Sequence, residues 1–246
     1  MSQRQIFRRL IVTADVPTDK RKAIVEALMD LAAQRPWHEI EIGDVAKAAH
    51  VSLAEFRDLF PSKGAVLGAL SRQIDRQVLE GTTDDLAGEP ARERIFDVLM
   101  RRFDALEPYK QALRRIFQDL QYDPVSLAAL NQVSLNSQRF MLAAAGIDTE
   151  GPLGKLKLQG AVLVYANTMR TWLDDDDPTL AKTMARLDRE LRRAERILEG
   201  AEDLRRLSAP LRAVGRALMQ GRRPTRPETR RTEDGNGDAQ NPASAI

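Results

Sequence analysis

The sequence predicts an all-α protein with an N-terminal helix-turn-helix head and a C-terminal helical bundle. Three observations support this fold class. Leu, Ala, Arg and Glu dominate the composition, which favours helix. β-Branched runs bounded by turn signals are scarce, and apolar residues recur at helical spacing along most of the chain. A chain of 246 residues is long enough for one helical body, or for two modules sharing a seam, with a sizeable core.

Composition excludes several classes of function. The chain has no cysteine, so disulfides, thiolate metal sites and cysteine nucleophiles are excluded. The two histidines, His38 and His50, are too few for a metal site, and the acidic run 174–177 lacks the spaced ligands and glycine of a calcium loop. No Ser/His/Asp set or Gly-rich phosphate loop is present. We therefore expect no enzyme, no metal and no cofactor.

Charge and hydropathy are consistent with a cytoplasmic protein. The net charge is +2, and no region carries the dense positive charge of a strong non-specific DNA binder. Nothing resembles a signal peptide or a spanning segment of about 20 apolar residues. The sequence therefore predicts a cytoplasmic location without integral membrane association.

The chain begins with a basic arm, residues 1–18, which includes Arg4, Arg8 and Arg9. Such an arm can reach a minor groove or phosphates, or it can be a flexible terminus with no specific role. The first firm helix is predicted from a cap at Thr18 or Asp19 to Gln34. Its buried face and the residue expected to pack under the following helices are Ile24, Ala27, Leu28, Leu31 and Trp37.

Two short helices with a tight turn are predicted between Glu41 and Lys63. The first covers Gly43 to Ala49, with an apolar stripe at helical spacing, and His50 occupies a turn position that needs a left-handed backbone. Ser52 is an N-cap for the second helix, with Glu55 at the capping-box position. The buried positions and the stop are Phe56, Leu59, Phe60 and Pro61.

At these residues the chain resembles the TetR family of transcriptional regulators. The resemblance rests on Val45-Ala46, Ala49, Val51-Ser52, Phe56 and Phe60-Pro61-Ser62-Lys63, and it covers about 20–70. It implies a DNA-binding head at 19–80, whose last helix leads to a ligand-binding and dimerisation body at 90–200. The function implied is that of a repressor that leaves a double-stranded operator when a small apolar effector binds.

The second helix of the helix-turn-helix, Leu53 to Leu59, is the one that would enter a DNA major groove. Arg57 can bind a guanine edge or a phosphate, whereas Glu55 and Asp58 would repel phosphates unless they read cytosine. DNA contact by this helix and a scaffold that has lost DNA binding both stay open. The candidate DNA-contacting residues are Gly43, Ser52, Leu53, Ala54, Glu55, Arg57 and Lys63.

Turn-forming residues at 81–90 mark the boundary between head and body. From 91 to 200 the chain is predicted to be entirely helical, and Gly200 is predicted to end the last helix. The large side chains concentrated there can line an apolar effector pocket between helices, or can be plain core. The candidate pocket residues are Phe103, Phe117, Tyr122, Phe140, Tyr165, Met169 and Trp172.

The resemblance also implies that the helices at about 153–173 and 178–199 form a four-helix interface in a homodimer, with an apolar region at Leu163, Tyr165 and Met169. A weaker resemblance links 171–191 to ubiquinone-biosynthesis accessory proteins, which keep a TetR-like fold, bind lipid and do not act on DNA. It implies the alternative function, a lipid- or isoprenoid-binding accessory protein.

Residues 201–220 are predicted to form an extra amphipathic helix that covers the body, binds a partner or lies on an anionic membrane surface. The tail, 221–246, is low in apolar residues and is predicted to be disordered.

Overall fold

A computed structural model describes residues 16–81, 86–120 and 123–220, and within these ranges the chain is helical with no strand. The basic arm up to residue 15, Tyr122 and the tail lie outside the described residues. The head comprises α2 (Val16–Gln34), the 3-10 turn η1 (Trp37–Glu39), α3 (Ile42–Ala48) and α4 (Leu53–Leu59). The other helices are α5 (Lys63–Glu80), α6 (Ala91–Leu106), α7 (Lys110–Leu120), α8 (Pro124–Ala144), α9 (Gly154–Leu173) and α10 (Ala181–Gln220), with a 3-10 turn η3 (Glu107–Tyr109) between α6 and α7.

The head is the helix-turn-helix that the sequence predicts. His50 has a φ of 54°, which confirms the left-handed turn, and Ser52 caps α4 as expected. Phe56 is 1% exposed and packs with the buried face of α3 in one core. The first helix starts at Val16, ahead of the predicted cap at Thr18 or Asp19. Backbone N–H groups in the first turn of a helix have no partner within it, so Pro17, which has no N–H, fits there.

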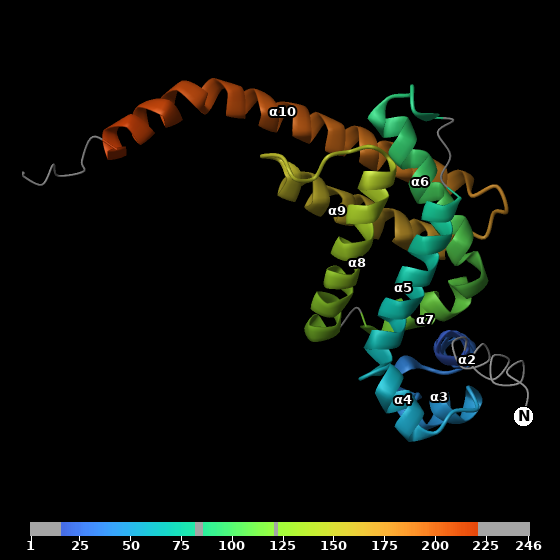
Figure 1. Cartoon of the computed structure of the whole chain (residues 1–246). Coiled ribbons are helices and arrows are strands. Elements are labelled where there is room, and N and C mark those ends of the chain that lie inside the picture. Colours follow the sequence, from blue (N-terminus) through green and yellow to red (C-terminus); the bar gives the residue numbers. More distant parts are fainter. Residues whose placement is uncertain (1–15, 82–85, 121–122, 221–246) are drawn as a thin grey trace, which may run out of the picture. The chain divides into compact units, whose positions relative to one another are not determined.

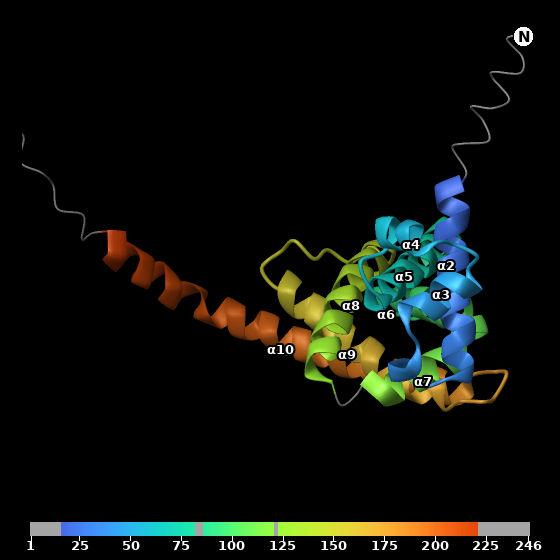
Figure 2. The same cartoon turned by 90° about the horizontal axis from the view of Figure 1, so that it is seen from below.

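α5 belongs to both halves of the molecule (Figure 1). It starts beside α4, packs against α2, and then runs between α6 and α8. Its N-cap is Ser62, whose hydroxyl accepts from the Ala65 N–H. The view from below shows α3 and α4 next to α2 and α5 (Figure 2). The described residues up to Glu202 form one compact unit, so any movement of α5 affects both the head and the body.

The predicted end of the last helix at Gly200 is wrong, because α10 continues through it to Gln220. A glycine costs only about 1 kcal/mol inside a helix, and the flanking Leu198, Glu199, Ala201 and Glu202 are strong helix formers. Residues 201–220 are therefore the end of α10 and not a separate helix. From Asp203 on, α10 belongs to a second compact unit.

The acidic run before α10 stabilises the start of that helix, as the sequence predicts. Asp175 is fully buried and accepts from the backbone N–H and the hydroxyl of Thr183, at 2.9 and 2.8 Å. Asp177 accepts from the Thr179 N–H at 2.9 Å. In the described part of the chain no cluster of His, Cys, Asp and Glu has the make-up of a metal site. Among those same residues, no helix is both long enough and apolar enough to span a bilayer.

Candidate nucleic-acid interface and effector cavity

The outer face of α4 is exposed to solvent. Leu53 is 61% exposed, and Ala54, Arg57 and Asp58 are exposed as well, whereas Phe56 on the opposite side is buried. The capping box and the α3 contact fix this orientation. α4 therefore presents two apolar side chains, one guanidinium and one carboxylate to any surface that approaches the head.

Glu55, one of the two acids that the sequence places on this helix, is folded back onto the head. Its carboxylate accepts from the backbone N–H of Ser52 at 2.8 Å and from the Ser52 hydroxyl at 2.9 Å. It also accepts from Lys20 Nζ of α2 at 2.6 Å. The hydrogen bond from Lys20, followed by those from Ser52, lowers the pKa of Glu55 from 4.5 to about 2. Its charge is therefore compensated, and Asp58 is the acid that remains exposed on α4 without an ion pair among the described residues.

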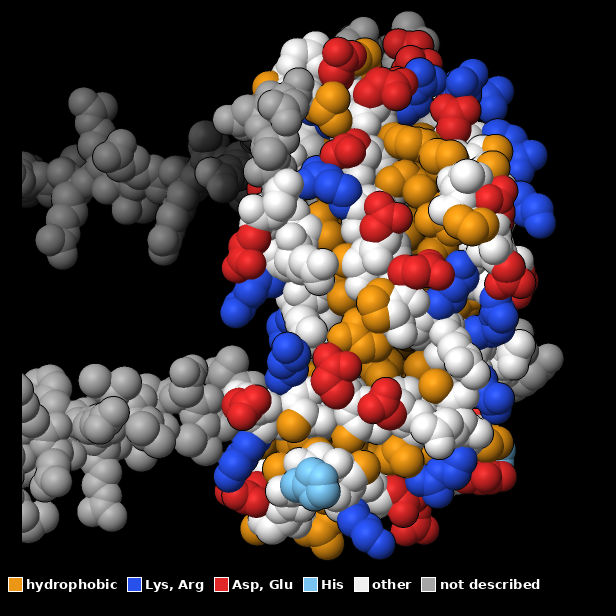
Figure 3. All heavy atoms as spheres, turned by 90° about the vertical axis from the view of Figure 1, so that its right-hand side faces the viewer, with side chains coloured by type: hydrophobic (Ala, Val, Ile, Leu, Met, Phe, Trp, Pro, Cys, Tyr) orange, Lys and Arg blue, Asp and Glu red, His pale blue; other side chains and the backbone are white. Residues whose placement is uncertain are grey.

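Two basic side chains of α2 lie beside α4 and its C-cap, and α3 adds an exposed lysine. Arg21 lies over the Phe60 ring, with 5.1 Å between its guanidinium carbon and the ring centroid, and Lys20 is held at Glu55. Lys47 on α3 and Arg57 are exposed and form no ion pair in the part of the chain that the structure describes. The sequence prediction missed Lys20 and Arg21, although the run Lys20-Arg21-Lys22 was a visible signal. On the face in Figure 3, acidic and basic side chains are intermixed around exposed hydrophobic ones, so the positive charge there is local and not a broad field.

Two other candidates, Lys63 and Gly43, differ in their contacts within the head. Lys63 Nζ donates to the carbonyls of Trp37, at 2.8 Å, and Ile40, and lies 4.7 Å from the centroid of the Trp37 ring. Burial lowers its pKa. Gly43 is exposed at the start of α3, and a Cβ there would meet no atom within 4 Å. Lys63 thus joins α5 to the loop before α3, while the Gly43 backbone faces open space.

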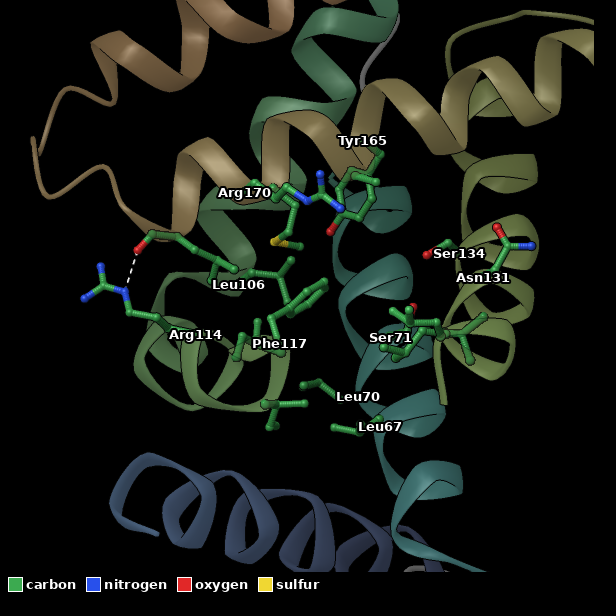
Figure 4. A pocket seen from close by; sticks show the side chains of 18 of the residues that line it. Leu67, Leu70, Ser71, Leu106, Arg114, Phe117, Asn131, Ser134, Tyr165 and Arg170 are labelled. Carbon is green, nitrogen blue, oxygen red and sulfur yellow. Dashed lines mark hydrogen bonds between the residues drawn. The ribbon is translucent and has the colours of Figure 1, made fainter. Parts of the chain in front are cut away.

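A cavity of about 510 Å³ lies in the body between α5, α6, α7, α8 and α9 (Figure 4). Its volume is within the range of small-molecule sites. Leu67, Leu70 and Ser71 of α5 form one wall, so the helix that leaves the head also borders the cavity. The other apolar lining residues include Leu106, Leu113, Ile116, Phe117, Leu127, Leu130, Val133, Val162 and Met169.

A buried polar network crosses one side of the cavity. Arg102 of α6 is 4% exposed and donates from Nε to Asp75 Oδ1 of α5 at 3.0 Å, from Nη2 to Ser71 Oγ at 3.1 Å, and from Nη1 to the Tyr165 hydroxyl of α9. Ser137 of α8 also donates to Asp75, at 2.7 Å. Burial raises the pKa of Tyr165 to about 12. The network thus joins four helices around one buried ion pair.

Comparison with known proteins bears on the fold. No protein-family model matches the sequence, and no curated protein sequence matches it. The chain is similar to a solved TetR transcriptional regulator from Nitrosomonas europaea, with a TM-score of 0.57 and 23% identity over 71% of this chain and 97% of that one. It is similar also to a TetR transcriptional regulator from Rhodococcus, with a TM-score of 0.55 and 21% identity over 72% and 96% of the two chains. The chain has the TetR regulator fold. Neither structure is a ubiquinone-biosynthesis protein, so that second resemblance stays a prediction.

In this TetR fold, the candidate pocket residues separate into three groups. Phe117, Tyr165 and Met169 line the cavity. Phe103 and Trp172 are fully buried in the core, where Phe103 stacks on Tyr165 at a centroid distance of 5.3 Å and is tilted against Trp172 at 5.6 Å. Phe140 is 56% exposed, and Tyr122 lies outside the described residues. The sequence could not separate pocket-lining residues from core residues, because both lie on the apolar face of a helix.

Direct hydrogen bonds join the head of the TetR fold to its body. Asp119 of α7 accepts from the Trp37 N–H at 2.6 Å, and Tyr109 of η3 donates to Glu26 of α2 at 2.8 Å. Gln111 donates to the Ala33 carbonyl at 3.2 Å. α2 and α7 also share the most extensive helix–helix contact among the described elements. The head is thus held by α7 as well as by α5, and both of these helices line the cavity.

Proposed function

We propose that this chain is a DNA-binding transcriptional regulator, and that a ligand in the body cavity controls its affinity for DNA. The observation that carries the proposal is the state of α4. Its exposed face offers Leu53, Ala54 and Arg57, while Lys20 and Ser52 hold Glu55 away from that face. An α4 of this kind can lie in a major groove, with Arg57 on a guanine edge or phosphate and the apolar groups on thymine methyls.

The remaining candidates have supporting roles in this proposal. Arg21 and Lys47 supply positive charge for the phosphates next to the groove, and the open space at Gly43 lets a phosphate approach the backbone at the start of α3. Lys63 supports the loop before α3 through its two carbonyl contacts and keeps one donor for a phosphate. Ser52 and Glu55 fix the start of α4 and do not read bases.

We further propose that the regulator acts as a homodimer through α9 and α10. Of the three residues predicted for that interface, Leu163 is 63% exposed, whereas Tyr165 and Met169 face the cavity and are not available. Met184 and Ile197 of α10 are exposed apolar side chains as well, at 37% and 54%. A two-fold dimer would place two heads on palindromic half-sites about 34–36 Å apart.

The coupling in this proposal depends on α5 and α7, since each contacts the head and lines the cavity. A ligand that fits the cavity only when these helices shift would favour a head spacing that does not match the operator. Such a ligand changes DNA affinity only to the extent that it binds the two states differently. We propose that the direction is release, which makes the protein a repressor.

Selection from a pool of random duplex DNA tests the DNA-binding proposal. The full chain should enrich a palindromic sequence, and fluorescence anisotropy should then give an affinity that falls steeply with salt. Arg57→Ala should weaken binding to that sequence and lower the salt slope by about 0.9 if the guanidinium neutralises one phosphate. Arg139→Ala, which removes an exposed arginine of α8, is the matched control.

Equal affinity of the wild type and Arg57→Ala for the enriched duplex would exclude a role for Arg57 in DNA binding. Enrichment of no sequence would exclude the DNA-binding function itself. The lipid-binding accessory protein would then become the leading alternative. That alternative rests on the weaker resemblance of 171–191. The two acids on α4 also favoured it, and the Lys20–Glu55 pair compensates the charge of one of them.

A further inference from the structure

The cavity borders more hydrogen-bond donors than its own walls can satisfy. The Arg102 guanidinium has five N–H groups, and three of these donate to Asp75, Ser71 and Tyr165. The Tyr165 and Ser71 oxygens accept from Arg102, and the protons of both hydroxyls find no acceptor among the described residues. Arg102, Tyr165 and Ser71 all line the cavity, and Figure 4 shows Tyr165 and Ser71 there.

The protonation of these groups makes them donors under ordinary conditions. Arginine keeps its charge at any physiological pH. Burial, the dominant influence, raises the pKa of Tyr165 to about 12, so its hydroxyl keeps its proton and remains able to donate. Unused donors in a buried site cost free energy, because they lose water without gaining another acceptor. A ligand with acceptor oxygens would remove that cost.

The formal charge of the lining favours an anionic acceptor over a neutral one. The lining contains Arg102, Arg114 and Arg170 against a single acid, Asp174. Arg114 is engaged with Asp176 at 3.0 Å and with the Leu173 carbonyl at 2.6 Å. Arg170 is exposed and forms no ion pair within the described part of the chain. Asp75, the counter-ion of Arg102, is not among the lining residues.

Most of the remaining lining is apolar, with leucines from α5, α6, α7 and α8 and with Phe117 and Met169. We propose that the ligand is an amphipathic carboxylic acid: its carboxylate accepts from Arg102, Tyr165 and Ser71, and its hydrocarbon body lies on these apolar walls. Its role as an effector rests on the proposed function, but its binding does not. This proposal refines the purely apolar effector that the sequence predicts.

The geometry also indicates what the acid would do to the protein. Arg102 holds Asp75 of α5 through Nε, and a second carboxylate on the same guanidinium would compete with Asp75 for its charge. The bond between α5 and α6 would weaken at the helix that continues into the head. A neutral ligand of the same shape would not have this effect.

Isothermal titration calorimetry on the full chain, without DNA, tests the proposal with two acids and their alcohols. Decanoate is compared with 1-decanol, and 4-phenylbutyrate with 4-phenyl-1-butanol, so that each pair shares its apolar body. At least one acid should bind about tenfold or more tightly than its alcohol, since charge-assisted hydrogen bonds in a dry site are strong. If both alcohols bind as well as their acids, or neither acid binds, the proposal is wrong.

Three variants locate the carboxylate without disrupting the buried ion pair. Tyr165→Phe and Ser71→Ala should each lower the affinity for the preferred acid several-fold and leave that for its alcohol unchanged. Arg170→Ala should lower the acid affinity and make it less sensitive to salt, whereas the exposed control Arg139→Ala should do neither. Unchanged acid binding in both Tyr165→Phe and Ser71→Ala would overturn the assignment.

The same measurements separate this proposal from the proposed function. A chain that enriches an operator but binds neither acid remains a regulator with a different ligand. A chain that binds an acid but enriches no DNA remains an acid-binding protein, and the regulator proposal is then lost.

Discussion

The carboxylate of Asp119 on α7 accepts a hydrogen bond of 2.6 Å from the backbone N–H of Trp37 in η1. The two residues are 82 positions apart, and the bond joins a cavity-lining helix to the loop that precedes the helix-turn-helix. Trp37 is also bound from the other side, where Lys63 at the start of α5 donates to its carbonyl. The peptide on either side of Trp37 is therefore held by both of the helices that connect the body to the head.

Asp119→Ala should destabilise the protein. It leaves the half-buried Trp37 N–H without its acceptor, which costs about 1–3 kcal/mol for a buried group and less here because the Asp119 side chain is 30% exposed. Urea denaturation measures the change in the free energy of unfolding. Asp119→Asn keeps an acceptor oxygen and should lose much less. An equal free energy of unfolding for the wild type and Asp119→Ala would show that this hydrogen bond does not stabilise the fold.

The Glu55 capping box predicts a specific dependence of stability on pH. The pKa of Glu55 is about 2 in the folded chain against an ordinary value of 4.5, chiefly because Lys20 donates to it. A lowered folded-state pKa stabilises the fold fully above pH 4.5, and that contribution disappears as the pH falls from 4.5 toward 2. The stability difference between the wild type and Glu55→Gln should therefore shrink across this window.

Denaturant titrations of both chains, at pH values inside and above the window, measure this difference. Lys20→Gln is the matched variant, because it removes the leading cause of the pKa shift and leaves the Ser52 bonds intact. It should reduce the pH dependence without abolishing it. A difference between the wild type and Glu55→Gln that stays constant from neutral pH down to the bottom of the window would contradict the assignment.

The buried pair of Asp75 and Arg102 should be far more important for stability than an exposed pair of the same type. Their side chains are 11% and 5% exposed, and removing the charge of one partner leaves the other buried and uncompensated. Asp75→Asn should therefore cost about 3–5 kcal/mol. Asp97→Asn breaks the 2.8 Å pair with Arg101 on the surface of α6 and should cost no more than about 1 kcal/mol. Similar losses in the two variants would show that the Asp75 site is hydrated.

Local signals predicted the head well, whereas the cavity depended on contacts that no local signal reveals. The cap at Ser52, the box at Glu55 and the left-handed turn at His50 each involve residues within three positions of one another, so their chemistry is visible in the sequence. The network around Arg102 joins residues 27, 31 and 63 positions away, and an arginine in the apolar stripe of α6 was its one trace. Lys20 on Glu55 is a long-range contact of the same kind, 35 positions apart.

A glycine ends a helix here where it adopts a left-handed backbone, and not where its neighbours continue the helix. Gly146 has a φ of 67° and follows α8. Gly200 lies inside α10 instead, because its neighbours continue the helix. The residue type is the same, and the difference is whether the chain needs to turn. Only the packing of the following segment decides that.

The exposed apolar residues of α9 and α10 predict how the proposed homodimer can be broken. Leu163 is 63% exposed on α9, the helix that also lines the cavity. A single exposed leucine is common on protein surfaces, whereas several exposed apolar residues side by side indicate an interface. If α9 and α10 form a two-fold interface, each copy contributes Leu163, so one substitution places two carboxylates in the same apolar seam. Leu163→Glu should then convert the dimer to a monomer in light scattering and lower operator affinity, because one head alone contacts one half-site.

Phe140→Glu changes a side chain that is 56% exposed on α8 and should leave the dimer intact. A dimer that dissociates with Phe140→Glu and survives Leu163→Glu would move the interface from α9 to α8.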